Sequence, residues 1–300
     1  MNSKNKDLFF LGKGGVGKST CSALTAIHLA NSGKNTLLVS MDPAHNQSDI
    51  FDVKFSEKPV KVKDNLFVKE VDINFWINQY LSDVKFQIKQ TYSYLTTFNL
   101  ENYFDIIKFS PGIEEYALLL AYQDIRNKNT DKDVIIFDMP PTALTLKFFG
   151  LPKLSLLWLQ KLLELRNKII EKRKIITKIK LGKKEIERDK ILNKLDQQIE
   201  QYANVKTVFE NNDKTVLNLV MNPDKLSFSE SELIISSLKN FNLFPTNVIV
   251  NKCIKDYDIS NIEKSFNYKN LQILSESTIP LLGLNVLESY LDTLNSFIQY

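Results

Sequence analysis

Short apolar runs alternate with stretches of helical spacing along most of the chain. The runs are rich in Val, Ile, Leu and Phe and are nearly continuous, as in strands that are buried on both faces. This alternation predicts an α/β fold with a doubly wound, mostly parallel sheet. The expected strands are 8–11, 36–41, 66–71, 106–109, 134–138, 216–221, 247–251 and 271–274, and the expected helices are 19–32, 75–98, 113–127 and 230–241.

One segment departs from this alternation. Residues 161–201 contain no proline and one glycine, Gly182, and their apolar positions recur at helical intervals. The glycine is expected to separate two helices. We therefore predict one domain over residues 1–300, with a helical insertion subdomain at 153–212.

The composition is that of an ordinary globular protein. Of the 300 residues, 43% are hydrophobic and 25% are charged, which argues against disorder. No run of eighteen apolar residues appears, and the polar start at 1–7 lacks the apolar centre of a signal peptide. Two cysteines, Cys21 and Cys253, fit a reducing compartment. We expect a cytoplasmic protein, with peripheral membrane contact left open.

The positive charge is local. The formal net charge is +4, but residues 161–194 contain thirteen Lys/Arg and five Asp/Glu, which leaves the rest of the chain at −4. One interpretation is a solvated basic face on a pair of amphipathic helices. The other is a surface that faces a partner or a membrane. Both remain open at this point.

The segment GKGGVGKST at 12–20 is the strongest chemical signal. It satisfies the spacing G-x-x-x-x-G-K-[ST] and lies between an expected strand and an expected helix. Such a loop turns successive N–H groups and a helix N-terminus toward one anion. We expect Lys18 to reach the β- and γ-phosphates, Ser19 to ligate Mg²⁺ and Thr20 to contact the α-phosphate of ATP. The backbone expected around the phosphates belongs to Gly12, Gly14, Gly15, Val16 and Gly17.

Two aspartates lie at the carboxyl ends of expected strands, and the strand that Asp42 ends is expected to neighbour the phosphate loop. Asp42 follows the strand 36–41, and Asp138 ends the strand 134–138. Parallel α/β sheets bind their ligands at this edge. Asp138 is predicted to face Mg²⁺, and Asp42 to orient a water for attack on the γ-phosphate and to contribute to the metal site.

Several motifs, in order, resemble the ArsA/Get3 family of P-loop ATPases. Lys13 matches the second lysine of the deviant phosphate loop, and SMDPAHNQSD at 40–49 is similar to the family's switch I. DMPPTALTLKFFGLP at 138–152 is similar to its switch II, with departures at Met139, Pro140, Ala143 and Leu144. Segments 110–115, 248–252 and 279–291 also match, so that only 153–212 is matched by helical character alone.

The resemblance implies roles for further residues. Lys13 would reach across a homodimer to the partner's nucleotide and join Asp42 and Lys18 in catalysis. Asn46 would lie on the γ-phosphate side, with His45 either a switch residue or a simple loop histidine. The remaining residues that the resemblance places at the nucleotide are Pro141, Asn251 and Lys252 beside the base, and Pro280 and Leu281 as its wall.

The resemblance leaves the coupled process open. One possibility is a hydrophobic membrane-protein client or membrane partner, and another is an arsenite pump. A three-thiolate arsenite site needs more than Cys21 and Cys253. A ParA/MinD-like positioning ATPase that binds DNA or membrane through the basic helices is a further alternative, against which segment 40–49 argues, and so is a non-hydrolysing regulatory module. We expect no nucleic-acid partner.

Overall fold

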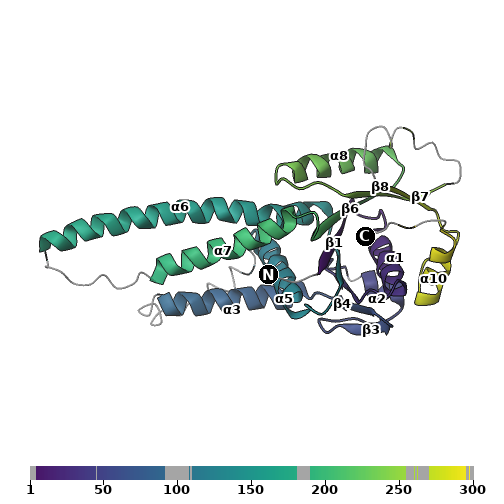
Figure 1. The fold of residues 1–300 in the computed structure, drawn as a ribbon, viewed down its shortest axis with the longest axis horizontal. Coiled ribbons are helices and arrows are strands. Elements are labelled where there is room, and N and C mark those ends of the chain that lie inside the picture. Colours follow the sequence, from purple (N-terminus) through teal and green to yellow (C-terminus); the bar gives the residue numbers. More distant parts are fainter. Residues whose placement is uncertain are drawn as a thin grey trace.

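The structure is a computed structural model that describes residues 5–44, 46–91, 108, 110–180, 190–254, 260, 262, 270–294 and 297. Eight strands form one sheet in the order β3-β4-β2-β5-β1-β6-β7-β8 (Figure 1). Its neighbours are parallel except β3 and β4. The strands are β1 (Lys6–Leu11), β2 (Thr36–Ser40), β3 (Val60–Lys63), β4 (Leu66–Glu70), β5 (Val134–Asp138), β6 (Thr215–Met221), β7 (Asn247–Cys253) and β8 (Asn270–Ser275). The doubly wound sheet is thereby confirmed.

Helices cover both faces of the sheet, because successive strand residues point to opposite sides. Leu8 and Phe10 of β1 face a core shared with α1, α2 and α10. Phe9 and Leu11 face the other core, shared with α3, α5, α6, α7 and α8. The helices are α1 (Lys18–Asn31), α2 (Asn46–Phe51), α3 (Ile73–Thr91), α5 (Ile113–Lys128), α6 (Thr142–Lys180), α7 (Lys190–Glu210), α8 (Lys225–Lys239) and α10 (Leu284–Asp292).

A cluster of aromatic rings anchors the longest helices to the sheet. Phe9 of β1 stacks on Phe137 of β5 with their ring centroids 4.9 Å apart. Phe149 of α6 and Phe209 of α7 pack edge-on against Phe9. Beyond this cluster α3, α6 and α7 extend away from the sheet on the same side (Figure 1). Within the described residues, no helix is both long and apolar enough to cross a bilayer.

A buried charged group lies at the start of β1. Asp7 accepts a hydrogen bond from the Tyr122 hydroxyl at 2.8 Å, and Arg126 Nε lies 3.4 Å from the same carboxylate oxygen. Burial raises the pKa of Asp7 to about 6, although Arg126 and Tyr122 act in the opposite direction. The pair ties α5 to β1 beneath the sheet, at the end far from the phosphate loop.

Most expected elements are confirmed within a few residues, and the differences have local causes. Helix α8 begins five residues before the expected position, since Asp224 caps it by accepting from the Ser227 amide at 2.9 Å. Strand β3 and helices α2 and α10 were not predicted. Helix α6 begins at Thr142 and continues through Pro152, so that the proposed subdomain boundary at 153 falls inside a helix. Of the expected strand 106–109 the structure describes Lys108 alone, which lies in a turn, and the expected helix end at 92–98 and Gly182 lie outside the described residues.

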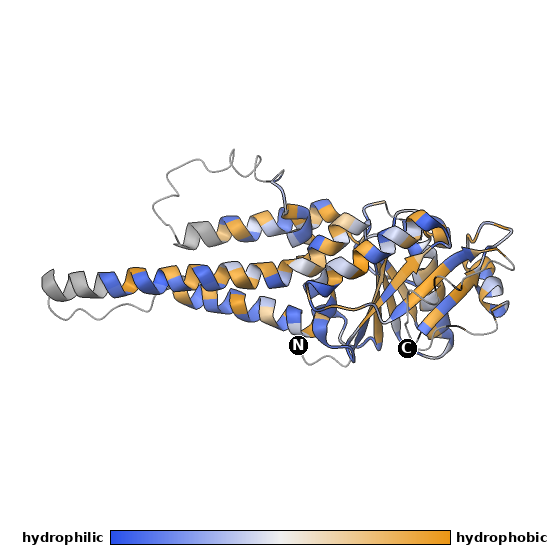
Figure 2. Cartoon of the chain, turned by 90° about the horizontal axis from the view of Figure 1, so that it is seen from above, coloured by the Kyte–Doolittle hydropathy of each residue, from blue (hydrophilic) through white to orange (hydrophobic). Residues whose placement is uncertain are grey.

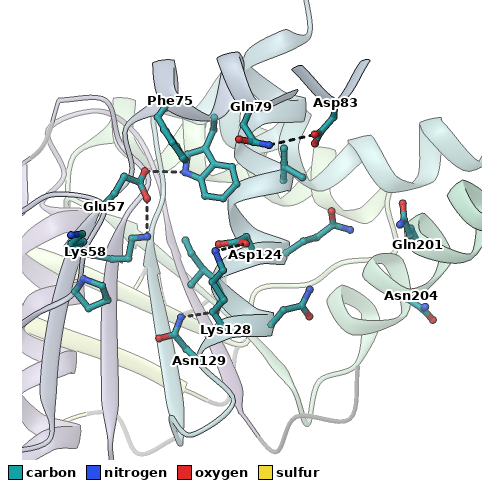
Figure 3. A pocket seen from close by; sticks show the side chains of 17 residues that line it. Glu57, Lys58, Phe75, Gln79, Asp83, Asp124, Lys128, Asn129, Gln201 and Asn204 are labelled. Atoms are coloured by element: carbon teal, nitrogen blue, oxygen red, sulfur yellow. Dashed lines mark hydrogen bonds and ion pairs between the residues drawn. The ribbon is translucent and has the colours of Figure 1, made fainter. Parts of the chain in front are cut away.

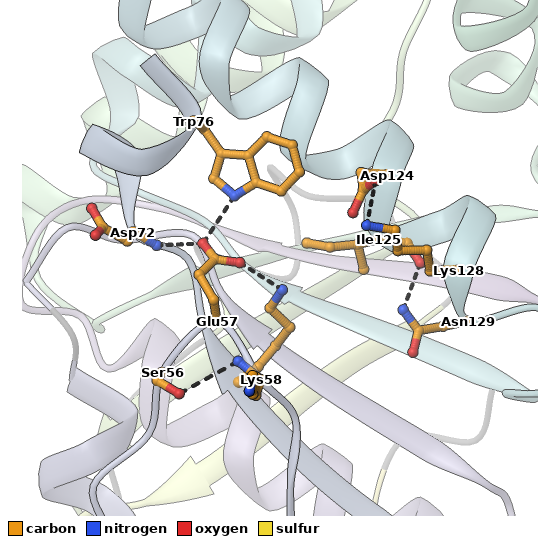
Figure 4. Close-up of polar contacts among 10 residues, drawn as sticks. Ser56, Glu57, Lys58, Asp72, Trp76, Asp124, Ile125, Lys128 and Asn129 are labelled. Atoms are coloured by element: carbon orange, nitrogen blue, oxygen red, sulfur yellow. Dashed lines mark hydrogen bonds and ion pairs between the residues drawn. The ribbon is translucent and has the colours of Figure 1, made fainter. Parts of the chain in front are cut away.

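One carboxylate ties the β3–β4 edge of the sheet to α3. Glu57 accepts hydrogen bonds from Lys69 Nζ at 2.9 Å, from the Asp72 amide at 2.7 Å and from Trp76 Nε1 at 2.9 Å (Figure 4). Lys69 and Trp76 are both buried. The three donors lie in one short segment that runs from the end of β4 to the first turn of α3, so Glu57 positions that turn against the sheet edge.

We predict that Glu57→Ala lowers the free energy of unfolding by about 2 kcal/mol, because it leaves buried donors of Lys69 and Trp76 without an acceptor. Chemical denaturation measures the change. Lys58→Ala is the matched control, since Lys58 is exposed, and it should stay within about 0.5 kcal/mol of the parent. Equal effects of the two substitutions would contradict the role given to Glu57.

Candidate nucleotide site

The phosphate loop joins the end of β1 to the start of α1. Its backbone has positive φ values at Gly12 (150°), Gly15 (81°) and Gly17 (90°). A Cβ at Gly12 would lie 2.1 Å from the carbonyl oxygen of Val220, and one at Gly17 would lie 2.3 Å from Asn251 Nδ2. Gly12 is therefore required both by conformation and by close packing against the backbone of β6, whereas Gly15 is required by conformation alone and a Cβ at Gly17 would meet the end of the Asn251 side chain. The predicted strand–loop–helix context is confirmed.

Lys18 turns back over the loop. Its ammonium donates to the carbonyl oxygen of Lys13 at 3.3 Å, and the side chain is buried. Burial lowers the pKa of Lys18, while the carboxylates of Asp138, Asp42 and Glu230 raise it. A cation held inside a curl of backbone amides, with carboxylates around it, can receive a phosphate chain.

Asp138 is buried at the carboxyl end of β5. Its Oδ2 accepts from Gln47 Nε2 at 3.0 Å, and the Ser19 hydroxyl lies near the carboxylate. Its Oδ1 has no partner. Burial raises the pKa of Asp138 to about 6, against the effects of Ser19, Gln47 and Lys18. An unpartnered carboxylate oxygen beside a serine hydroxyl fits a hard divalent cation that keeps several waters, as Mg²⁺ does.

Asp42 lies close to Asp138. The expectation that its strand neighbours the strand of the phosphate loop is wrong, because β5 lies between β2 and β1. The residue pair Ser40 and Asp138 are in register between β2 and β5, and the amide of Met41 donates to the Asp138 carbonyl at 2.9 Å. Asp42 is 8% exposed, and its Oδ1 accepts from the Ala44 amide at 3.0 Å. This turn fixes the carboxylate at the mouth of the loop.

The structure describes part of the rest of the predicted switch I segment. Asn46, the first residue of α2, donates to the Ser19 hydroxyl at 3.5 Å. His45 lies outside the described residues. Lys13, Ser19 and Thr20 are partly exposed, and Gly14 and Gly15 are exposed. The loop therefore presents a solvent-facing surface that includes Lys13.

The segment after β5 couples α6 to the loop. The Thr142 hydroxyl donates to Glu230 Oε1 at 2.9 Å and lies 3.5 Å from the Gly12 carbonyl oxygen. Met139 is fully buried in the core, whereas Pro141 is exposed. Lys147 pairs with Glu115 at 2.9 Å, which joins α6 to the first turn of α5. The two motifs predicted around 110–115 and 138–152 are thus in contact.

The residues predicted beside the base hold the loop from the β7 side. Asn251 Nδ2 donates to the carbonyl oxygen of Val16 at 2.9 Å, and Lys252 Nζ donates to that of Gly15 at 3.0 Å. Pro280 is exposed, and Leu281 packs on the core cluster that contains Val16. Asn251 and Lys252 are therefore neighbours of the loop, while their contact with a base stays a prediction.

Sequence reasoning missed three polar side chains at this site. Gln47 donates to Asp138, to the Ser22 hydroxyl and to the Ser19 carbonyl, each at 3.0 Å. The sequence feature that could have pointed to Gln47 is its position next to Asn46 in the predicted switch I segment. Thr142 was part of the predicted switch II motif but was given no role. No sequence feature pointed to Glu230, because nothing in the sequence places α8 beside the loop.

A groove of about 940 Å³ lies elsewhere, between α3, α5 and α7 (Figure 3). Glu57, Trp76 and Gln79 line one side, and Asn129, which precedes β5, lies at the end of that strand opposite to Asp138. Among the described residues, neither the phosphate loop nor the two site aspartates line it. The groove is therefore separate from the nucleotide site.

Known proteins share this arrangement of motifs. A family model described as anion-transporting ATPase matches residues 5–277. A protein of Aquifex aeolicus (strain VF5) named as an arsenical pump-driving ATPase is 31% identical over 249 residues, which cover 83% of this chain and 80% of the relative. An ATPase ASNA1 homolog of Plasmodium falciparum (isolate 3D7) is 32% identical over 266 residues, which cover 88% and 66% of the two chains.

The loop packing predicts a contrast between two neighbouring glycines. Gly12→Ala should lower the free energy of unfolding by at least about 2 kcal/mol and weaken nucleotide binding, because its Cβ overlaps the Val220 carbonyl at 2.1 Å. Gly14→Ala is the control, since its Cβ would meet nothing within 4 Å. Thermal or chemical denaturation of the nucleotide-free protein checks both. Comparable stabilities would contradict the packing argument.

Proposed function

This chain belongs to the ArsA-type family of anion-transporting ATPases, and we propose that it is a Mg²⁺-dependent, nucleotide-gated homodimer that couples ATP hydrolysis to the handling of a membrane-protein client or membrane partner. ATPase activity follows from membership of the family. The observation that carries the finer proposal is the convergence of Lys18, Asp138 and Asp42 on one loop at the carboxyl ends of β1, β5 and β2.

Phosphate binding is assigned to the loop and to Lys18. The curled backbone from Gly12 to Gly17 and the start of α1 offer N–H groups to an anion, and Lys18 adds a buried positive charge. Thr20 follows in the first turn of α1 and would contact the α-phosphate. The burial of Lys18 strengthens its attraction for phosphate, since little water screens the pair.

Ser19 and Asp138 would hold Mg²⁺. The serine hydroxyl already lies against Asp138, and the free Oδ1 of that carboxylate gives the metal a second oxygen or a water-mediated contact. A bound Mg²⁺ neutralises charge on the phosphate oxygens during transfer. Gln47 fixes the carboxylate from the opposite side, so the residue keeps one orientation in a fully buried place.

Asp42 would accept the proton of the attacking water or orient it, with Asn46 on the γ-phosphate side. The Ala44 amide holds one carboxylate oxygen of Asp42 in place. Because β2 and β5 are in register, this carboxylate approaches the metal side of the site without sharing the position of Asp138. Such an arrangement separates the roles of water activation and metal binding.

Lys13 would complete the site of a second protomer. It lies on the exposed side of the loop, next to the exposed Gly14 and Gly15, while Lys18 points inward. Two loops facing each other would bring each Lys13 to the other's nucleotide. Asn251 and Lys252 would lie beside the base, with Pro280 and Leu281 as its wall and Pro141 nearby in the moving segment.

The coupled process is proposed from the helical subdomain at 153–212. Its helix α6 carries large apolar side chains that are exposed to solvent, including Leu154, Leu157 and Trp158, which suits a hydrophobic client or a membrane. One relative is named as an arsenical pump-driving ATPase, and this name favours a second candidate function, that of an arsenite-pump-driving subunit. Against thiolate binding of arsenite, Cys21 and Cys253 are both buried, and burial raises the pKa of Cys21 to about 12.

Asp42→Asn is expected to reduce ATP turnover about 100-fold or more, because the amide cannot take a proton from water. Binding of a fluorescent ATP analogue should change less than about threefold, since the phosphates are held by the loop. Asp64→Asn is the control, on an exposed turn far from the loop, and should leave turnover unchanged. Full turnover in Asp42→Asn would remove this residue from the mechanism.

Lys13→Ala is expected to reduce turnover by at least about 100-fold and to abolish ATP-dependent dimer closure, because a cation supplied in trans stabilises transferred phosphate charge. Sedimentation with and without a non-hydrolysable ATP analogue follows closure, and denaturation shows that the monomer still folds. Lys34→Ala, an exposed lysine after α1, is the control. A parent protein with the same dimer fraction in both conditions would contradict nucleotide gating.

A further inference from the structure

Helix α6 leaves one long face uncovered. Among its residues whose side chains are described, up to Lys172, five large apolar side chains are exposed, although the same helix is packed on its other side through the buried Ser155 and Leu159. We call these five residues the α6 stripe. They are Leu154 (58% exposed), Leu157 (55%), Trp158 (67%), Leu165 (55%) and Ile169 (45%).

The spacing of the α6 stripe puts its members on one side of the helix. At 100° per residue they fall within a sector of about 120°, and from Leu154 to Ile169 they span about 22 Å along the axis. The projecting helices carry apolar and polar residues side by side along their length (Figure 2). The stripe is thus a continuous amphipathic surface on an element that stands away from the sheet.

Lysines share the sector with the apolar residues. Lys161, Lys168 and Lys172 are exposed and fall within the same 120° or so of the helix. Glu164 and Glu171 fall outside it, and the exposed ion pair between Lys161 and Glu164 at 3.0 Å is weak enough to exchange its partner. The segment 161–194 has thirteen basic and five acidic residues, so its charge matches an anionic surface.

We propose that the α6 stripe docks on the surface of an anionic lipid bilayer, with α6 lying along the membrane plane. Leu, Ile and Trp side chains enter the boundary between headgroups and acyl chains, and the lysine stems extend their ammonium groups to the lipid phosphates. Charge attraction adds to apolar burial when anionic lipid is present. The partner is therefore a peripheral lipid surface.

The lysines favour a bilayer over a purely apolar protein helix. A transmembrane helix laid along the stripe would cover Lys161 and Lys168 with apolar side chains, and burying unpaired ammonium groups is unfavourable. A headgroup layer neutralises them at the same depth at which the leucines are buried. The inference goes beyond the proposed function, since it requires neither hydrolysis nor a dimer.

The test uses the full chain without nucleotide and large unilamellar vesicles. Vesicles of phosphatidylcholine alone are compared with vesicles containing about 30 mol% phosphatidylglycerol, by flotation and by tryptophan emission. Trp158 is 67% exposed and Trp76 is 5% exposed, so a blue shift reports on the stripe. We expect binding at least tenfold tighter to the anionic vesicles, and its loss as salt rises.

Two double variants separate the apolar from the charged contribution. Leu157→Ser with Leu165→Ser should weaken vesicle binding at least tenfold, and Lys168→Glu with Lys172→Glu should remove the preference for anionic lipid. The matched control is Leu226→Ser with Leu233→Ser, which alters equally exposed leucines (65% and 67%) on α8. It should bind within twofold of the parent. Circular dichroism verifies that each variant is folded.

Three outcomes of the vesicle experiments alone would overturn the inference, and two further results would assign the stripe to another partner. The first is the absence of vesicle binding at low salt, and the second is equal binding to both kinds of vesicle. The third is a loss of vesicle binding in the α8 control variant that equals the loss in the Leu157→Ser, Leu165→Ser variant. If a solubilised apolar helical peptide shifts the Trp158 emission while vesicles do not, the stripe binds protein and the lipid proposal fails. If the stripe becomes accessible to solvent only when the protein is diluted, it is an interface between copies of the chain. None of these results affects the ATPase proposal, which turnover measures separately.

Discussion

The phosphate loop touches two strands of the sheet at points where a single additional carbon atom would not fit. Gly12 passes against the Val220 carbonyl of β6, and Gly17 passes against the Asn251 amide of β7. This close passage fixes the height of the loop above the sheet edge. The direction of α1, the inward position of Lys18 and the reach of Ser19 toward Asp138 all follow from that height.

Around the loop, buried polar groups are arranged so that one side chain serves several others. Gln47 donates to Asp138, Ser22 and the Ser19 carbonyl, although one amide nitrogen has only two hydrogens. The three acceptors therefore share these hydrogens, and Asp138 keeps an oxygen without a partner. A carboxylate with raised pKa and an incomplete set of bonds favours the arrival of a cation.

Most of the sheet and the loop were predictable because they depend on local pattern. Buried parallel strands give continuous apolar runs, and the glycine and lysine spacing of 12–20 has a single structural context. The edge strand β3, with alternating lysines, gave no such run. Glu230 and Gln47 were not found, since their importance comes from contacts between elements distant in sequence. The start of α6 at Thr142 was not predicted, and two prolines directly before this helix and Pro152 inside it are residues that helical patterns usually lack.

Thr142 touches the loop through Gly12 and is also the first residue of a helix that runs without interruption to Lys180. A helix of 39 residues is about 58 Å long. Its first turn lies at the nucleotide site, and its last turn lies at the far end of the projecting helices (Figure 1). For a straight helix of this length, a tilt of about 5° at the first turn would move the last turn by about 5 Å, close to the rise of one helical turn. A change at the site that is small on the scale of the sheet core would therefore correspond to a displacement as large as a side chain at the far end.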